Sequence, residues 1–296
     1  MTRAERVAIS GLLLFTAAAL LGYWAFALHP QWLPQDERAL KFYSISFRFF
    51  AQIHIAVAAL ALAVPLVRRA GVKWIPGFAG VFLVSFLSEF IGTGYGIPFG
   101  GYGYTALLGV QLGGRVPALI PVSWFLMALP SFVLAQAAFA GRHVAVRIGA
   151  AAALLVIWDL ALDPAMSYLT PYWVWEETGP YYGMPWMNLL GWFATGVVLM
   201  ALLSRLGGPR WSEWVPPRFS AAYYGAVLLM PLGMVFAAGE WLAVVVTLSA
   251  VGAWAGLTRL AGSPDSDTEA AAQGAPTSSE GIDAGPRQVA TLGLGS

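Results

Sequence analysis

The stretch EFIGTGYGIPFGGYGY, residues 89–104, is unusual in a chain that is apolar over most of its length. It closes an apolar run long enough to cross a membrane, and it places a carboxylic acid, Glu89, near the end of that run. Six glycines, one proline and three tyrosines follow. A carboxyl group at membrane depth is costly and glycine is a poor helix former, so this segment is expected to do more than span lipid.

The composition of the whole chain is that of a membrane protein. Of its 296 residues, 58% are hydrophobic and only 10% are charged, against about 25% charged residues in an average soluble domain. The net charge of +1 provides no field that would attract nucleic acid, so we expect no nucleic-acid partner. The sequence contains no cysteine, which excludes disulfides, thiol catalysis and thiolate metal ligands.

Apolar runs of about 20 residues predict an all-α integral membrane protein, a bundle of about eight transmembrane helices. Two long outer loops, 93–115 and 166–188, are rich in glycine and aromatic residues. The first apolar run follows Arg3 and Arg6 and could be a signal peptide, but its length and the lack of a convincing cleavage site favour an uncleaved helix. The expected spans are 5–28, 47–66, 74–92, 116–139, 144–163, 185–206, 220–238 and 240–260.

The distribution of basic residues predicts the orientation of the bundle. When alternate loops are pooled under the positive-inside rule, most of the 16 Lys and Arg residues fall on one side. We therefore predict a multi-pass protein of the cell membrane with both termini cytoplasmic. A polytopic membrane domain is expected over 1–261, and the small, polar residues of 262–296 predict a disordered tail. The opposite, outer side holds only Arg38, Lys41, Arg48 and Arg115.

Three carboxyl groups collect near the outer end of this predicted bundle. Glu89 lies about one turn from the outer end of its span, while Asp159 and Asp163 are four residues apart and so share one helix face. Pro164 is expected to end their helix. Carboxyl groups inside a membrane favour a functional role, and hydrogen bonding between helices, with a partner such as Asn188, is the structural alternative.

One short motif suggests an ion channel. The sequence GTGYG, residues 92–96, contains most of a potassium-filter signature. The match is short by one residue, and Pro98 and Phe99 follow it where an outer pore mouth would be required. The same glycines resemble a dinucleotide fingerprint, which requires a preceding strand and a soluble helix. Neither motif is well supported.

A second motif suggests a prenyl-transferring enzyme. The sequence DLALD, residues 159–163, has a spacing that could hold a divalent cation bridging a diphosphate. The outer side offers essentially Arg115 alone to bind the phosphate oxygens, so this evidence is weak. The residues His29, His54 and His143 are too scattered for a metal cluster, and we expect no metal site. A lone histidine within a span, such as His54, is more often packed or hydrogen-bonded than a ligand.

The carboxyl groups and their aromatic surroundings favour acid catalysis. In an apolar pocket without counter-cations, carboxyl groups are expected to stay protonated near neutral pH and to act as acids. Such an acid can protonate a carbon–carbon double bond if the resulting carbocation is tertiary and lies against aromatic faces. Water would capture the cation, and a second carboxyl or a tyrosine would take up the proton that the water loses. Proton-coupled transport is the alternative.

Four blocks of the sequence, in order, are SEFIGTGYGIPFGGYGYTALLG, GGRVPALIPVSWFLM, WDLALDPAM and GPYYGMPWMNLLGWF. Together they resemble the CruF-type membrane carotenoid hydratases, also described as carotenoid biosynthesis proteins, over about residues 45–260. The resemblance implies a hydro-lyase that adds water across the terminal 1,2 double bond of an acyclic carotenoid and gives a tertiary alcohol, with no redox cofactor or metal. It implies a lipid-soluble carotenoid substrate, contact with membrane lipid, and other carotenoid biosynthesis enzymes as partners.

The roles of individual residues follow from the acid chemistry. We predict that Asp159 or Glu89 protonates the double bond, and that Asp163 binds or deprotonates the incoming water. The glycines and Pro98 are expected to fold the chain back so that a thin polyene end can approach Glu89. The residues expected to bind the substrate are Tyr95, Phe99, Tyr102, Tyr104, Trp173, Tyr181, Tyr182 and Asn188.

Overall fold

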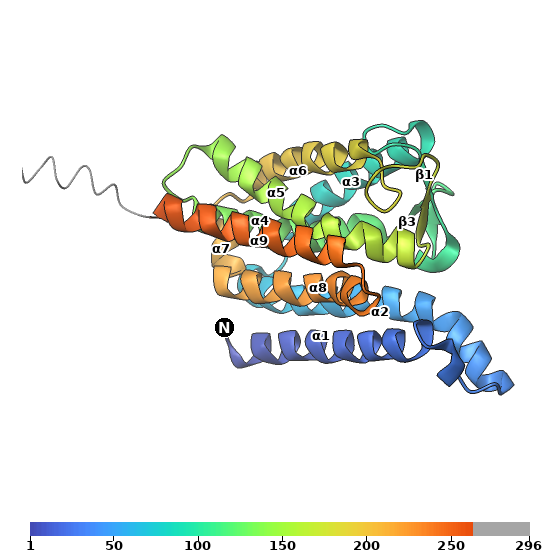
Figure 1. Ribbon diagram of the computed structural model, residues 1–296. Helices are drawn as coiled ribbons and strands as arrows, with labels where there is room; N and C mark the ends of the chain where they lie inside the picture. Colours follow the sequence, from blue (N-terminus) through green and yellow to red (C-terminus); the bar gives the residue numbers. More distant parts are fainter. Residues whose placement is uncertain (263–296) are drawn as a thin grey trace, which may run out of the picture. The chain divides into compact units, whose positions relative to one another are not determined.

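The protein is an all-α integral membrane protein, as the sequence predicts. A computed structural model describes residues 1–262, and within them eight helices are long and apolar enough to cross a membrane. The tail predicted over 262–296 lies outside the described residues except for Gly262. The first and last described helices begin and end at one end of the bundle, and the strands lie at the opposite end (Figure 1).

Most helix bounds agree with the predicted spans to within a few residues. The spanning helices are α1 (Arg3–Gly22) with the π-helical η1 (Tyr23–Ala27), α2 (Glu37–Ala70), α3 (Ile75–Tyr95), α4 (Leu119–Ala138), α5 (Val144–Asp163) with the π-helical η4 (Pro164–Leu169), α6 (Trp186–Leu206), α8 (Pro217–Ala237) and α9 (Trp241–Gly262). Short helical segments complete the connections: η2 (Pro30–Trp32), η3 (Ala106–Leu108) and α7 (Arg210–Trp214).

Helix α2 is longer than the predicted span, which began at residue 47. The helix begins after Asp36, whose carboxylate accepts hydrogen bonds from the backbone N–H groups of Arg38 (3.1 Å) and Ala39 (3.0 Å). This is a strong N-cap, because it satisfies two of the N–H groups left free at a helix start. The charged residues of its first turns hide the start of this helix from a search for apolar runs.

Pro164 ends the α-helical hydrogen bonding of α5, as predicted, but not the helical path. The chain continues as the π-helical turn η4, because proline has no N–H to donate to the preceding turn. The hydroxyl group of Ser167 donates to the backbone carbonyl of Asp163 (2.8 Å) and so satisfies an acceptor at this junction. The end of α5 therefore carries Asp163 at a change of helical geometry.

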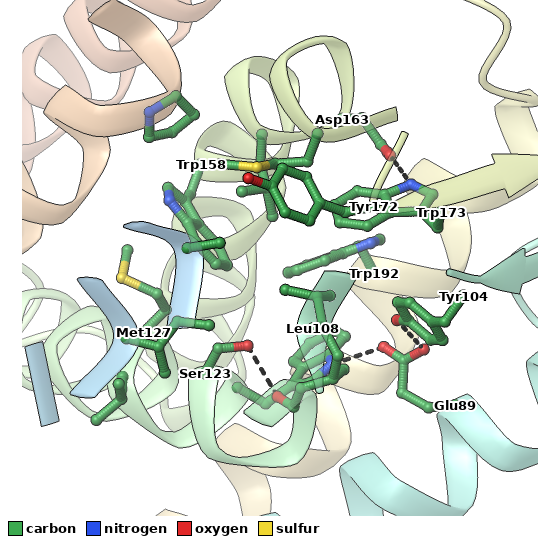
Figure 2. A pocket seen from close by; sticks show the side chains of 18 of the residues that line it. Glu89, Tyr104, Leu108, Ser123, Met127, Trp158, Asp163, Tyr172, Trp173 and Trp192 are labelled. Atoms are coloured by element: carbon green, nitrogen blue, oxygen red, sulfur yellow. Dashed lines mark hydrogen bonds between the residues drawn. The ribbon is translucent and has the colours of Figure 1, made fainter. Parts of the chain in front are cut away.

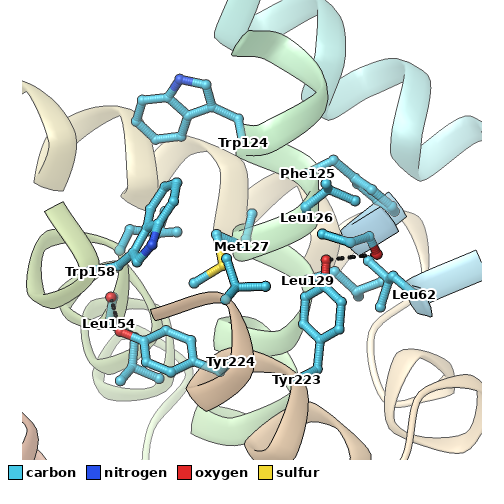
Figure 3. Packing of buried hydrophobic residues seen from close by; sticks show 14 of the residues in the cluster. Leu62, Trp124, Phe125, Leu126, Met127, Leu129, Leu154, Trp158, Tyr223 and Tyr224 are labelled. Atoms are coloured by element: carbon cyan, nitrogen blue, oxygen red, sulfur yellow. Dashed lines mark hydrogen bonds between the residues drawn. The ribbon is translucent and has the colours of Figure 1, made fainter. Parts of the chain in front are cut away.

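Helix α4 forms the centre of the bundle. About two thirds of its span is buried, against 17% for α9 at the periphery, and it packs against α3, α5 and α8. Figure 3 shows the apolar side chains of α4 facing Tyr223 and Tyr224 of α8. The hydroxyl group of Tyr223 donates to the carbonyl of Ala58 (3.1 Å) and that of Tyr224 to the carbonyl of Leu154 (2.7 Å). These bonds fasten α8 to α2 and α5.

The two long connections that precede α4 and α6 contain short strands that were not predicted from the sequence. Strand β1 (Tyr102–Tyr104) pairs antiparallel with β4 (Trp173–Trp175), and β2 (Gln111–Leu112) pairs with β3 (Val116–Pro117). In the first pair Tyr102 lies opposite Trp175, and Tyr104 lies opposite Trp173. Alternate side chains of a strand point to opposite faces. Four aromatic rings therefore face the bundle, and the β1–β4 pair fixes the two loops to each other.

Candidate active site

A cavity of about 100 Å³ lies where the spanning helices meet the β1–β4 pair. We call it the first cavity. Side chains from α2, α3, α4, α5, α6 and α8 line it together with the four strand aromatics. Within residues 1–262 its lining includes no Lys or Arg, and its charged or acidic members are Glu89 and Asp163. Figure 2 shows these two residues at separate positions on the wall.

Glu89 of α3 is surrounded by three hydrogen-bond donors. The indole N–H of Trp124 donates to Oε1 (2.8 Å), and the hydroxyl of Tyr104 donates to Oε2 (2.8 Å). The hydroxyl of Tyr102 also donates to Oε2. The side chain of Glu89 is only 3% exposed, so these three groups take the place of water. Both carboxyl oxygens are therefore satisfied by donors from α4 and β1.

The glycines after Glu89 allow β1 to come this close. Helix α3 ends at Gly96, which has a left-handed backbone (φ 72°) and donates its N–H to the carbonyl of Gly92 (2.8 Å). A Cβ atom at Gly92 would lie 2.8 Å from the ring of Phe99 and 3.1 Å from the hydroxyl of Tyr102. The glycines fold the chain back toward Glu89 as predicted, and the side chains of Phe99 and Tyr102 lie against Gly92; the approach of a polyene end to Glu89 stays a prediction.

Asp159 and Asp163 share a single amide group on α6. The Nδ2 of Asn188 donates to Oδ2 of Asp159 (3.0 Å) and to Oδ2 of Asp163 (2.5 Å). The indole N–H of Trp173 donates to Oδ1 of Asp163 (2.8 Å). Among the described residues, Oδ1 of Asp159 has no hydrogen-bond partner although it is buried. The pair is thus less completely satisfied than Glu89.

The two aspartates differ in their access to the first cavity. Asp163 lies on its wall, whereas Asp159, one turn earlier on α5, is fully buried and is linked to the wall through Asn188. The spacing of four residues stacks the two side chains, as the sequence predicts. A group bound in the cavity can therefore touch Asp163 directly and Asp159 only through its neighbours.

The predicted substrate-binding residues divide into two sets. Five line the first cavity: Phe99, Tyr102, Tyr104, Trp173 and Asn188. The other three lie elsewhere. Tyr95 is 77% exposed and borders a separate hollow lined by glycines together with Glu176 and Glu177. Tyr181 donates its hydroxyl to the carbonyl of Leu160 (2.6 Å), and Tyr182 accepts from the N–H of Ala243 (3.2 Å), so both pack in a neighbouring cluster beside α9.

Comparison with known proteins assigns the chain to a family. Residues 50–253, more than half of the sequence, match the family model described as carotenoid biosynthesis protein. The chain belongs to this family. It is 31% identical over 186 residues to bisanhydrobacterioruberin hydratase from Haloarcula japonica. The alignment covers 62% of this chain and 60% of that relative, which is less than two thirds of the relative's length. No solved structure matches the chain.

Three tryptophans that the sequence analysis did not select line the first cavity of this carotenoid biosynthesis protein. Trp192 of α6 stacks on Trp124 of α4, with ring centroids 4.1 Å apart and an interplanar angle of 23°. Trp158 of α5 meets Trp192 edge-on at 5.8 Å. All three lie within apolar spans rather than in the interfacial belts that tryptophan prefers, and this position is the signal that could have identified them.

His54 of α2 also lines the first cavity and is buried. Its Nε2 lies 3.1 Å from the hydroxyl oxygen of Thr16 on α1. The prediction that a lone histidine here is hydrogen-bonded is therefore confirmed. The contact joins α1 to the wall of the first cavity.

The two tyrosines beside Glu89 remain hydrogen-bond donors over a wide range of pH. Burial raises the pKa of the Tyr102 and Tyr104 hydroxyls well above 10, and the adjacent Glu89 carboxyl raises it further. Their raised pKa keeps both groups neutral at physiological pH. The O–H groups are consequently available to the carboxyl group of Glu89 whenever the fold is intact.

Proposed function

We propose that this member of the carotenoid biosynthesis family is a carotenoid hydratase, a cofactor-independent hydro-lyase. It adds water across the terminal 1,2 double bond of an acyclic carotenoid end group and gives a tertiary hydroxyl. The observation that carries the proposal is the pairing of two separate carboxyl clusters with an aromatic-walled cavity lacking Lys and Arg among the described residues. The similarity to a hydratase from Haloarcula japonica supports it.

The acid in this proposal is Asp163, supported by Asp159. Two carboxyl groups that share one amide in an apolar site repel each other when both are ionised, so the pair holds one proton. Asp163 lies on the cavity wall and donates that proton to C2 of the double bond. This assignment departs from the sequence-based expectation of Asp159 or Glu89, because Asp159 reaches the wall only through Asn188.

The carbocation left at C1 is tertiary and is stabilised by aromatic faces. Trp192 and Trp173 line the first cavity together with the strand tyrosines. The negative faces of such rings attract a cation, and the attraction increases where water is excluded.

Glu89 acts as the base in the proposed reaction. The indole N–H of Trp124 can only donate, and together with two hydroxyl donors it offsets part of the cost of burying the ionised carboxylate. When water attacks C1, Glu89 takes the proton that the water loses, and the hydroxyl stays on the product. One proton leaves the aspartate pair and one arrives at Glu89, so the next turnover requires only its return through exchange with water.

The rival functions are less well supported by the geometry. In the described chain, no cationic side chain lines the first cavity for a diphosphate, and the guanidinium of Arg115 lies 5.4 Å from the ring centroid of Phe90 instead. The amide of Asn188 already lies against both aspartates of the DLALD motif. The GTGYG segment forms the last turn of α3, and the carbonyl of Gly92 accepts the N–H of Gly96, so this carbonyl is not free for an ion.

The proposal is tested by expressing the chain in cells that accumulate an acyclic carotenoid and measuring the mass of the pigment. We expect a gain of one water per hydrated end. A gain of an isoprenoid unit would favour prenyl transfer instead, and unchanged pigment in cells that contain the folded protein would contradict hydration. The Asp163→Asn variant controls for conversion by host enzymes.

The proposed function also implies a location for the protein in the cell. We expect the protein in the cell membrane, in contact with lipid and with other carotenoid biosynthesis enzymes, with both termini cytoplasmic. The excess of basic residues near those ends supports this orientation. Tags at each terminus and protease treatment of sealed vesicles test it, and a tag that is accessible from outside would reverse the assigned side of the active site.

A further inference from the structure

A second cavity of about 420 Å³ lies beside the first. It is lined by the end of α1 with η1, by the first turns of α2, and by side chains of α8. Every described residue on its wall is uncharged, and most are apolar or aromatic. The part of α2 that precedes the predicted span supplies several of these residues, including Phe42, Tyr43 and Ser46.

The two cavities share two wall residues, Tyr172 and Met230. Tyr172 is held firmly: its N–H donates to the carbonyl of Met166 (2.8 Å), and its hydroxyl donates to the carbonyl of Phe47 (2.9 Å). Met230 of α8 is unbranched and adapts its shape readily. The boundary between the cavities therefore consists of one fixed aromatic ring and one flexible side chain.

We propose that the second cavity binds the polyene chain of the substrate while the reacting end occupies the first cavity. This inference rests on the hydratase function proposed above. A cavity of about 100 Å³ accommodates a chain end but not a polyene many times longer, so the rest of the chain must leave through an apolar passage. The second cavity adjoins the first at Tyr172 and the flexible Met230, and its uncharged, aromatic wall matches a hydrocarbon chain.

Two serines of α2 provide a matched pair for a binding test. The hydroxyl of Ser46 donates to the carbonyl of Tyr43 (2.8 Å), and that of Ser44 to the carbonyl of Lys41 (2.7 Å), so both make the same local contact. Ser46 lines the second cavity, whereas Ser44 is exposed on another face of the helix. The natural chain has no cysteine, so Ser46→Cys and Ser44→Cys each introduce a single thiol.

The first experiment measures alkylation of these thiols by N-ethylmaleimide in membranes, with and without an acyclic C40 carotenoid. We expect the carotenoid to slow labelling of Ser46→Cys severalfold and to leave Ser44→Cys unchanged. Equal rates for Ser46→Cys with and without carotenoid would overturn the inference. Because labelling does not require turnover, this result is separate from the hydration assay.

The second experiment narrows the cavity with Ser46→Trp and uses Ser44→Trp as its control. We expect Ser46→Trp to lower kcat/KM for the full-length carotenoid by about tenfold or more. A short acyclic terpene with the same end group should be hydrated equally by both variants. Equal kcat/KM of the two variants for the full-length carotenoid would contradict the proposed polyene site. Absence of hydration by the unmodified protein would instead contradict the proposed function.

Discussion

The two carboxyl clusters of the first cavity differ in how fully their oxygens are satisfied. Glu89 receives three donors, from Trp124, Tyr102 and Tyr104, one on Oε1 and two on Oε2. Asp159 and Asp163 share one amide, and Oδ1 of Asp159 has no partner among the described residues. Both clusters are almost completely buried. Equal burial therefore coexists with different hydrogen bonding.

Burial alone therefore does not assign the role of a carboxyl group. A carboxyl group surrounded by donors is stabilised in its charged form, and a pair of carboxyl groups with few donors is stabilised when it holds a proton. Two groups of one chemical type can in this way serve as base and acid at the same pH. The following substitutions test the division, from the largest expected effect to the smallest.

The largest effect is expected for Asp163→Asn. The amide keeps the size of the side chain and its hydrogen bond to Trp173, but it cannot donate the acidic proton. We expect hydration to fall by about a hundredfold to ten-thousandfold, the usual contribution of a general acid. Turnover of an acyclic carotenoid, measured by chromatography and mass, checks this. Near-normal turnover in correctly inserted protein would show that Asp163 is not the acid.

Glu89→Gln is expected to lower turnover by about a hundredfold, because the base is lost. It should also destabilise the protein by about 1–3 kcal/mol, because the amide keeps one acceptor oxygen where the carboxyl group offers two to the Trp124 indole and the two tyrosine hydroxyls. Thermal unfolding in detergent separates the two effects. Trp124→Phe is the control, since it removes one donor and leaves the carboxyl group. If Glu89→Gln were as stable and as active as the unmodified protein, the base would have to be sought elsewhere.

Asp159→Asn is expected to lower turnover by only about tenfold. Asp159 does not line the first cavity, and its substitution leaves Asp163 in place but removes the partner that holds a shared proton. The ratio of the rates of Asp159→Asn and Asp163→Asn is the informative quantity. A larger loss for Asp159→Asn would restore the sequence-based assignment of the acid.

The smallest effect is expected for Tyr102→Phe. One donor on Oε2 of Glu89 is lost while the hydroxyl of Tyr104 remains, so turnover should fall by less than about tenfold. Because burial raises the pKa of both hydroxyls well above 10, neither tyrosine ionises as the pH rises from neutrality to 10. The unmodified protein should therefore show no loss of activity from tyrosine ionisation in that range. An activity midpoint below pH 10 that disappears in Tyr102→Phe would contradict this.

The sequence was sufficient to predict the helical bundle and the collection of acids at one end. Spans follow from apolar length, and the stacking of Asp159 and Asp163 follows from helical period. Asn188 was correctly selected as a polar partner. These features depend on local sequence, which is why they are predictable.

Other parts of the site depend on contacts between distant segments. The pairing of Tyr102 with Trp175 joins loops more than 70 residues apart, and no local pattern specifies it. Short strands of three residues carry little periodicity of their own. Trp124 and Trp192 lie in stretches of sequence that resemble any other apolar span. Only the packing of α4 against its neighbours turns them toward the first cavity.

The register of the β1–β4 pair limits how the loops of this site can change in length. Tyr102 and Tyr104 face inward because they occupy alternate positions, while Gly103 and Val174 face outward and are exposed. A shift of either strand by one residue exchanges its two faces. The insertion or deletion of one residue would replace aromatic rings by glycine or valine in a single step. Insertions or deletions of an odd number of residues in these loops should therefore lower activity far more than substitutions at the same positions.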